Sequence, residues 1–486
     1  MKFDEFKSLA HTHKIVTITE TMLADMLTPV SAYMRLRRNA ETSFLFESVE
    51  GDEKIARYSF LGRSPTFTIR NKNFETRISN HNNERILYDN YFDILTNLIA
   101  QYNISRTPNT SRFAGGFVGY FGYDIIRNIE KVPNKNPNDI TADETILGFF
   151  PTVLIFDHLK HQIIFLSNIF IDDNLSLELQ YDTAMNEIAM LKNDLIQSEF
   201  RLGNFSANIS DLKSNTTQTE FEANVLRAKS YIGAGDIFQV VLSQRFEIPY
   251  SGDDFNVYRA LRVVNPSPYL YYLDFGDCRV IGSSPEILVR KENDYAEVYP
   301  IAGTRKRGTN EQEDKQLEND LLKDEKELAE HIMLVDLGRN DLGRICKPGT
   351  VKVDELMKIV RYSHVMHIAS RVSGIIEENK TAIDVLKAAF PAGTVSGAPK
   401  IRAMEIIDEL ENVQRGIYAG GIGYIDLSGN LDTCIAIRTI FAKNGVLYFQ
   451  SGAGIVADSI PVNEYQETLH KSEAIVEAIK LAKGLK

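Results

Sequence analysis

The chain has 486 residues, of which 43% are hydrophobic and 25% charged, the balance of an ordinary globular protein rather than of a disordered or repetitive one. Its formal net charge of -12 opposes the phosphate backbone of DNA and RNA, so no nucleic-acid partner is expected. The three cysteines, Cys278, Cys346 and Cys434, lie far apart without CxxC spacing, which excludes a zinc or disulfide framework and favours a reducing cytoplasm.

Residues 1–200 consist mainly of short apolar runs divided by turn residues, which predicts a strand-rich region. The most apolar run, 146–156, spans 11 residues around Pro151, and the first residues lack the apolar core of a signal peptide, so no membrane-spanning segment is expected. Four clustered glycines lack the strand, turn and helix order of a phosphate loop. A structural role is therefore favoured for Gly115, Gly116, Gly119 and Gly122.

Two apolar runs between Thr145 and Phe170 flank the polar sequence DHLKH and predict a β-hairpin, followed by a helix that ends near Gln197. Residues 198–219 are rich in Ser, Asn and Thr and have little periodicity, which is typical of a surface connection. We place the domain boundary there, between an N-terminal region, 1–200, and a C-terminal region, 220–486.

Many strands of the C-terminal region are predicted as adjacent pairs, as around Gly429, rather than as regular βαβ units. This pattern favours an α+β fold with large antiparallel β-sheets. No repeat of 20 to 50 residues is visible, which sets solenoids and propellers aside.

Two predicted helices carry carboxylates in pairs. Residues 313–337 contain no Gly or Pro and have apolar residues at helical spacing, which predicts one long helix that presents Glu327 and Glu330 on one face. The helix predicted for 463–483 presents Glu464 and Glu467 in the same way, with Lys471 beside them. The four carboxylates suit a shared Mg²⁺ ion, but they equally suit two solvated faces with lysine partners, and the spacing leaves both open.

Six segments, in this order, resemble the chorismate-utilising enzymes: GSSPEILV from Gly282, PIAGTRKRG from Pro300, ELAEHIMLVDLGRNDLGR from Glu327, VMHIASRV from Val365, PAGTVSGAPK from Pro391 and QSGAGIVADS from Gln450. The sequences FLFES, ending at Ser48, and NPSPYL, from Asn265, extend the resemblance toward component I of anthranilate synthase. The resemblance implies that the antiparallel sheets pack face to face with helices on the outside. It makes 220–486 the chorismate-binding catalytic region.

The resemblance also implies a Mg²⁺ site. Glu330 and Glu467 match the metal ligands of the family, whereas Glu327 and Glu464 match carboxylates that reach the ion through water. Chorismate is a dianion, and a cation on its ring carboxylate absorbs charge while an amine displaces the ring hydroxyl.

Three residues match catalytic positions of the family. Glu286 matches the general acid that protonates the leaving hydroxyl, and His367 matches the histidine of the later pyruvate elimination. Thr394 completes the implied catalytic set. Judged without the resemblance, Glu286 is equally a surface glutamate at a strand start, and His367 a structural histidine.

Fixed donors are implied for the second carboxylate of chorismate, because arginine pairs with a carboxylate in a bidentate manner and glycines admit a ligand close to the backbone. The alternatives are plain burial for Tyr418, a surface ion pair for Arg438 and a turn for the glycines. The implied substrate contacts are Gly303, Thr304, Tyr418, Arg438, Gly452, Ala453, Gly454 and Lys471.

Ala302 indicates which nucleophile attacks the ring of chorismate. Relatives that form isochorismate or aminodeoxychorismate carry lysine at this position, and alanine can neither deprotonate water nor form an adduct with the ring. Ammonia is therefore the expected nucleophile. None of the three cysteines lies in the glycine-flanked context of a glutaminase nucleophile, so we expect a separate glutamine amidotransferase subunit as partner.

Ser48, Pro268, Tyr269 and Leu270 match the site at which tryptophan inhibits members of the family. The prolines of this segment are equally compatible with turns, and Tyr269 with a core position. The sequence thus predicts a Mg²⁺-dependent lyase that converts chorismate and ammonia to anthranilate and pyruvate through an aminodeoxyisochorismate intermediate. The alternatives are aminodeoxychorismate synthase component I and a non-catalytic tryptophan-sensing relative.

Overall fold

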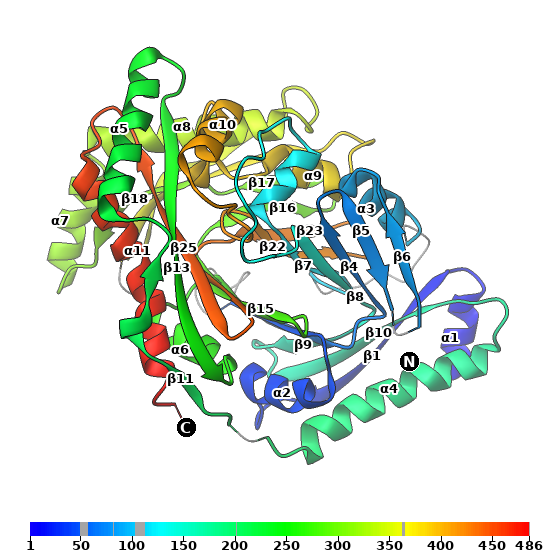
Figure 1. Ribbon diagram of the computed structural model, residues 1–486. Coiled ribbons are helices and arrows are strands. Elements are labelled where there is room, and N and C mark those ends of the chain that lie inside the picture. The colour runs from blue at the N-terminus through cyan, green and yellow to red at the C-terminus, as the bar shows by residue number, and fades with distance from the viewer. Residues whose placement is uncertain (49–56, 81, 103–111, 201, 362–364, 486) are drawn as a thin grey trace.

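A computed structural model describes residues 1–486 except 49–56, 81, 103–111, 201, 362–364 and 486. Two large antiparallel sheets, of 13 and 12 strands, form the centre of the molecule (Figure 1). None of the helices in the described part of the chain combines the length and apolar character that a bilayer crossing requires.

The first sheet has the spatial order β1 (Ile15–Leu23), β10 (Gln162–Phe170), β9 (Thr152–Asp157), β3 (Tyr58–Arg63), β2 (Ser43–Glu47), β14 (Tyr269–Asp274), β15 (Cys278–Ser284), β24 (Thr439–Lys443), β25 (Val446–Ile455), β13 (Gln239–Gly252) and β11 (Phe205–Ala207). The short strands β12 (Lys213–Ser214) and β21 (Gly397–Ala398) also pair with β13.

The second sheet has the spatial order β18 (Ile301–Lys306), β20 (Val365–Ile375), β17 (Tyr295–Val298), β16 (Ile287–Glu292), β23 (Leu431–Ile435), β22 (Gly421–Asp426), β7 (Gly116–Phe121), β8 (Thr145–Phe150), β4 (Phe67–Lys72), β5 (Glu75–Ser79) and β6 (Glu84–Leu87). Strand β19 (Lys352–Arg361) pairs with β20.

The sheets pack face to face through an aromatic-rich core, in which Phe44 and Phe60 of the first sheet meet Tyr424 and Ile146 of the second. The outer face of the first sheet is covered by α1 (Phe3–Ala10), α2 (Pro29–Leu36), α4 (Leu177–Gln197), α6 (Phe255–Val264) and α11 (Pro461–Ala482). The other main core holds α3 (Tyr91–Ala100), α5 (Gln218–Ala234), α8 (Glu325–Gly343), α9 (Ala382–Ala389) and α10 (Lys400–Leu410). The predicted fold class is confirmed.

Strands from both predicted regions occupy each sheet. In the first, β2 pairs with β14, and in the second, β7 pairs with β22. The predicted connection, 198–219, itself contains β11 and β12, both paired with β13. The two regions therefore share their cores.

Several local predictions are confirmed: β9 and β10 form the hairpin, α4 ends at Gln197, and β22 and β23 pair around Gly429. The glycine cluster is structural, since a Cβ on Gly119 would lie 1.9 Å from the carbonyl oxygen of Ile146. The apolar run 146–156 is divided at Pro151, with β8 in one sheet and β9 in the other.

The single helix predicted for 313–337 is wrong. The chain forms α7 (Glu311–Leu321) and α8, separated by a break at which the Asp324 side chain accepts hydrogen bonds from the amides of Lys326 and Glu327. Asp324 thus caps a new helix. The helix predicted for 463–483 is confirmed as α11, whose buried residues include Glu464, Thr468 and Ser472.

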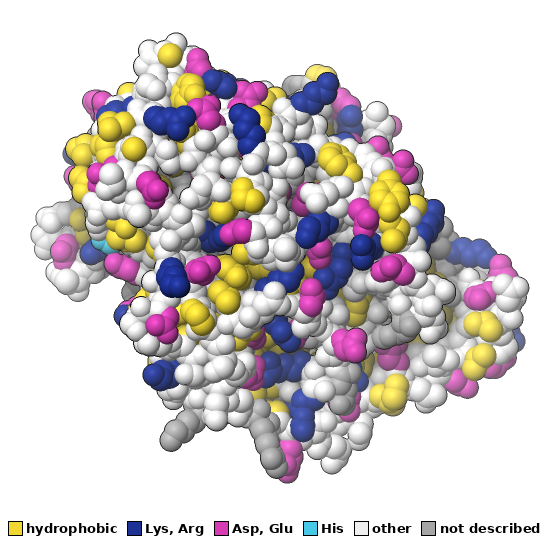
Figure 2. Space-filling model, in the orientation of Figure 1, with side chains coloured by type: hydrophobic (Ala, Val, Ile, Leu, Met, Phe, Trp, Pro, Cys, Tyr) yellow, Lys and Arg dark blue, Asp and Glu magenta, His cyan; other side chains and the backbone are white. Residues whose placement is uncertain are grey.

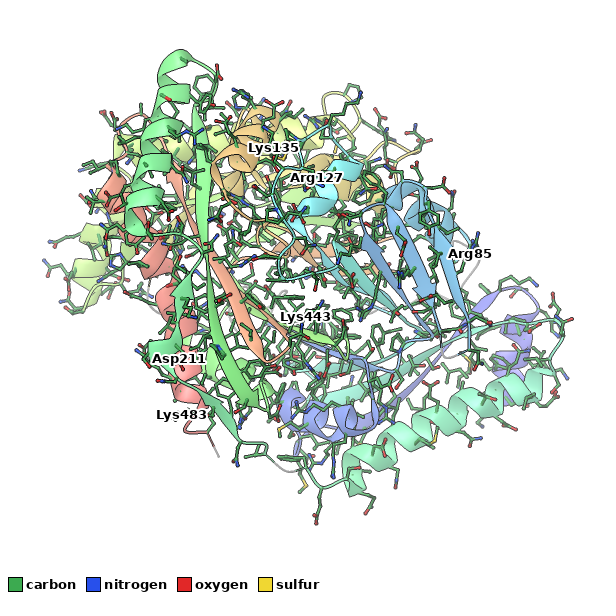
Figure 3. All side chains as sticks on the ribbon, viewed as in Figure 1. Arg85, Arg127, Lys135, Asp211, Lys443 and Lys483 are labelled. Carbon is green, nitrogen blue, oxygen red and sulfur yellow. The ribbon has the colours of Figure 1, made fainter. Side chains whose placement is uncertain are left out.

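Surface charge is mixed. Figure 2 shows Lys and Arg interspersed with Asp and Glu on the face that it presents. Arg127 and Lys135, labelled in Figure 3, lie beside α10, where the Arg127 guanidinium and the Lys135 amide both donate to Asp408. Such pairs join the N-terminal region to the helices of the C-terminal region.

Candidate active site

A cavity of about 570 Å³ is lined by residues of β13, β25, β18, α8 and α11 and of the segments between them. Fourteen of the fifteen residues predicted for catalysis, substrate or metal line it, although they come from segments far apart in the chain. They are Glu286, Gly303, Thr304, Glu327, Glu330, His367, Thr394, Tyr418, Arg438, Gly452, Gly454, Glu464, Glu467 and Lys471.

Ala453 is the exception. Its side chain is fully buried in the core behind β25, because successive side chains of a strand point to opposite faces. Gly452 and Gly454 face the cavity, where a Cβ on Gly452 would lie 2.7 Å from the Tyr418 hydroxyl. Only the backbone of Ala453 is thus positioned beside a ligand.

The four glutamates of α8 and α11 share this cavity. Burial, and then the charge of Glu330, raises the pKa of Glu327, while burial also raises the pKa of Glu464, with a contribution from Glu467. Glu467 pairs with Lys471 at 2.6 Å, as the solvated-face alternative expects for part of the set. No group of three metal-binding side chains within the described ranges is already gathered closely enough to hold an ion.

The donor set nevertheless fits a hard divalent cation. Carboxylate oxygens are its preferred ligands, and mutual repulsion between carboxylates is relieved by a cation between them. Glu330 is further oriented by Gln239, whose Nε2 donates to Glu330 Oε1 at 3.2 Å.

Glu286 lies after β15 and immediately before β16, with 9% of its surface exposed. Its backbone carbonyl accepts a hydrogen bond from the Ile435 amide at 2.9 Å, which fixes the segment against β23. Burial raises the pKa of the Glu286 carboxyl to about 8, and Thr394 and Lys471 only partly offset the shift. The group is therefore a protonated acid at neutral pH, and the surface-glutamate alternative is excluded.

His367 lies on β20, with Nδ1 2.9 Å from the carbonyl oxygen of Gly303 and 3.0 Å from the Thr304 hydroxyl. A carbonyl only accepts, so Nδ1 carries the proton and the lone pair is on Nε2. Burial lowers the pKa of His367, and nearby Arg438 lowers it further. The lowered pKa favours the neutral form of this imidazole.

Arg438 occupies an unfavourable left-handed conformation, with φ of 51°, immediately before β24. Burial lowers the pKa of its guanidinium, and in the described part of the chain no carboxylate offsets that cost. Tyr418, buried beside it, has its pKa raised by burial to about 12 and remains a neutral donor. This end of the cavity is suited to an anion.

Sequence reasoning missed other residues of the cavity wall. Gln239, Val241 and His470 lie outside the quoted motifs, and Gln450 lies within one but was given no role. Val241 and Gln239 occupy a strand whose pattern carries no sign of a ligand, so only the fold identifies them.

A second pocket brings together Ser48, Pro268, Tyr269 and Leu270, because β2 and β14 pair with Leu270 opposite Glu47. The residues that follow Ser48, 49–56, lie outside the described ranges. Tyr269 donates to Asp432 at 2.8 Å and accepts from Arg290 at 2.8 Å. Charged groups of both signs and aromatic rings line this pocket: Glu47, Tyr58, Phe60, Arg112, Tyr269, Arg290, Tyr424 and Asp432.

Comparison with known proteins places these features in a family context. The chorismate binding enzyme family matches residues 42–477. Anthranilate synthase component 1 of Acetivibrio thermocellus is 48% identical, covering 99% of this chain and 98% of the relative, and that of Aquifex aeolicus is 46% identical with the same coverage.

Solved structures agree with the sequence relatives. Anthranilate synthase component I from Streptococcus pneumoniae superposes with a TM-score of 0.77 at 39% identity, over 94% of this chain and 99% of that one. The menaquinone-specific isochorismate synthase of Escherichia coli, at 18% identity and a TM-score of 0.73 over 98% of each chain, has the same fold.

Proposed function

The chain belongs to the family of chorismate binding enzymes, and from this we propose that it is the chorismate-converting component of an anthranilate synthase. It converts chorismate and ammonia to anthranilate and pyruvate, the first committed step toward tryptophan. The observation that carries this proposal is one cavity holding paired carboxylates, a buried glutamate with a raised pKa, and an arginine whose charge no carboxylate of the described residues offsets.

The cavity contains both a carboxylate cluster and a desolvated arginine, which suits a dianion with one carboxylate on the ring and one on the enolpyruvyl group. Arg438 and Tyr418 are the donors for the enolpyruvyl carboxylate, supported by the backbone of Gly452–Gly454. Lys471 donates to the Gly452 carbonyl at 3.0 Å and thereby holds that stretch against α11.

The carboxylate cluster is suited to Mg²⁺, for which Glu330 and Glu467 are the proposed direct ligands and Glu327 and Glu464 the proposed ligands through water. Bound there, the ion would neutralise the ring carboxylate and take up charge that develops during displacement. Calorimetric titration with Mg²⁺ tests this: Glu330→Gln and Glu467→Gln should lose binding and turnover while keeping the wild-type circular dichroism. Unaltered binding in both variants excludes the site.

Ala302 lines the cavity where a water-activating relative carries lysine, and only 8% of it is exposed. Ammonia is already nucleophilic, so it needs no base at this position. Nitrogen bonds to the ring, the ring double bond shifts, and the C–O bond to the hydroxyl breaks. Glu286 gives its proton to the departing oxygen, which leaves as water.

The second step eliminates pyruvate from the aminodeoxyisochorismate. A ring proton must leave while the C–O bond between the ring and the enolpyruvyl group breaks, and a neutral imidazole is a suitable acceptor for that proton. The enolpyruvate that departs takes up a proton at its methylene carbon and becomes pyruvate. His367 fills this role, since its pKa is lowered by burial and the lone pair lies on Nε2.

Ammonia is delivered by a separate glutamine amidotransferase subunit. Burial raises the pKa of Cys278 to about 12 and that of Cys346 to about 11, and it also raises the pKa of Cys434. None of these three thiols is a ready thiolate, so none suits the nucleophile of a glutaminase. The names of the relatives as component 1 also support a second component.

Tryptophan is the proposed occupant of the pocket at Ser48 and Pro268–Leu270. Its aromatic walls suit an indole, and its acidic and basic groups suit an amino acid zwitterion. Binding there would inhibit the enzyme from a distance, because the active-site cavity is lined by other residues.

Product identification tests the function. Purified chain with chorismate, Mg²⁺ and ammonium salt at alkaline pH should form fluorescent anthranilate and pyruvate without glutamine. Aminodeoxychorismate, which retains the enolpyruvyl group, would instead identify an aminodeoxychorismate synthase. Tryptophan binding without any turnover of chorismate would identify a sensor.

A further inference from the structure

Arg415 and Glu411 form an ion pair behind the active-site cavity, with side chains 1% and 6% exposed. The pairing is bidentate: Arg415 Nε donates to Glu411 Oε2 at 2.9 Å, and Nη2 donates to Oε1 at 2.6 Å. Neither residue lines the cavity, and neither has a role in the chemistry proposed above.

Arg415 contacts three walls of the cavity at once. Its guanidinium donates to the carbonyl of Val395, next to Thr394, at 2.8 Å and to the carbonyl of Val241 on β13 at 2.7 Å. It also lies over the ring of Tyr418, 5.4 Å from the centroid. One side chain thus fixes the Thr394 turn, the strand and the substrate-facing tyrosine relative to each other.

Glu411 carries the network to a fourth wall. Its Oε1 accepts from the amide and the hydroxyl of Ser243, at 2.9 and 2.6 Å. Because the Ser243 hydroxyl donates its hydrogen to the carboxylate, its oxygen can only accept from Gln450 Nε2, at 2.7 Å. The chain of bonds therefore fixes which way the Gln450 amide points in the cavity wall.

Burial of two charges carries a large desolvation cost, and such pairs are often replaceable by apolar residues without loss of stability. The pair is placed where every hydrogen bond that it makes fixes a cavity-lining segment. We propose that Arg415 and Glu411 are positioning residues, which hold Thr394, Tyr418 and Gln450 in the arrangement required for chorismate conversion. This inference rests on the proposed function.

Arg415→Lys keeps the charge but cannot form the bidentate pair and both carbonyl bonds. We expect kcat/KM for chorismate to fall about 10- to 100-fold, since small misplacements of reacting groups have effects of this size. Arg37→Lys is the matched control. Arg37 also pairs bidentately, with Asp253, and also lies over a ring, that of Phe255, but away from the cavity. Arg37→Lys should lower the melting temperature about as much as Arg415→Lys does and leave kcat and KM within about twofold of the wild-type values.

Ser243→Ala removes the hydroxyl that links Glu411 to Gln450 and leaves the hydrogen bonds of Arg415 in place. It should raise KM for chorismate about fivefold, the effect of one hydrogen bond, and leave kcat within about twofold, whereas Arg415→Lys lowers kcat as well. This split between kcat and KM distinguishes positioning from a loss of stability, which would shift melting temperatures alone.

Values within about twofold of wild type for both Arg415→Lys and Ser243→Ala would overturn the inference. If Arg415→Lys does not fold, the Ser243→Ala result decides. Failure of the wild-type chain to form anthranilate would contradict the proposed function instead. Calorimetric chorismate affinities of the three variants would then still test whether the pair shapes the cavity.

Discussion

Glu286 is the residue whose surroundings most directly determine its chemistry. Its raised pKa, about 8, keeps it protonated at neutral pH and deprotonates it as the pH rises further. At a fixed concentration of free NH₃, kcat should therefore fall as the pH rises through about 8. Glu286→Gln should lower kcat about 10²- to 10⁴-fold and abolish this alkaline limb. A pH–rate profile for both proteins checks the prediction, and an unchanged alkaline limb in the variant would assign it to another group.

Arg438 combines a strained backbone with a desolvated charge, and both features indicate a role in ligand binding rather than in stabilising the fold. Arg438→Met should raise KM for chorismate about 100-fold or more, the loss of a charged hydrogen-bonded contact, with an unchanged or higher melting temperature. Arg339→Met, which removes an exposed arginine from α8, is the control. A large fall in melting temperature with normal KM would mean that Arg438 is structural.

The sequence predicted those site residues whose role depends on the chemistry of their own side chain. The carboxylate pairs follow from helical spacing, and the resemblance identified Glu286, His367 and Arg438. Arg415 could not be found in this way, because its bond to Val241 joins residues 174 positions apart. Nor could the raised pKa of Glu286, which depends on neighbours from several elements.

Among the elements, the break between α7 and α8 matters most for the site, because Glu327 and Glu330 occupy the first turns of α8. The sequence does hold the signal: Asp324 precedes Glu327 by three residues, as in a capping box. The apolar spacing continues across this signal and therefore predicted one helix instead of two. The division of 146–156 between two sheets has no such local signal beyond Pro151 and follows from the pairing of β8 and β9 with different partners.

Asp324→Ala should remove the cap and lower the free energy of unfolding by about 0.5–2 kcal/mol. Loss of its 2.8 Å contact with Arg305 should also loosen the turn that holds Glu327 and raise the Mg²⁺ concentration needed for half-maximal activity. Asn310→Ala removes the equivalent cap of α7 and should affect stability alone. Equal Mg²⁺ requirements in both variants would contradict a role of the α8 cap in the proposed metal site.

At the scale of the whole molecule, the two pockets are joined through β23. Cys434 lines the Ser48 pocket, and the next residue, Ile435, accepts from the Ser284 hydroxyl at 2.7 Å and donates to the Glu286 carbonyl. The predicted regions share both sheets, so continuous strands connect the two pockets. Sequence could predict the two sheets as a class but not which strands would be neighbours.

This arrangement predicts reciprocal coupling. With ammonia withheld, chorismate should weaken tryptophan binding by the same factor by which tryptophan weakens chorismate binding, about 5- to 150-fold, or ~1–3 kcal/mol. Calorimetric titrations in both orders measure the two factors. A tryptophan affinity that is indifferent to chorismate would remove the regulatory role from this pocket.

We infer that ammonia attacks chorismate in a cavity formed by this chain alone. The most direct measurement is a turnover in ¹⁵N-ammonium with chorismate and Mg²⁺, followed by mass spectrometry of the product. We predict anthranilate that carries the heavy nitrogen, together with pyruvate. A product without nitrogen, or heavy aminodeoxychorismate that accumulates without pyruvate, would contradict the claim.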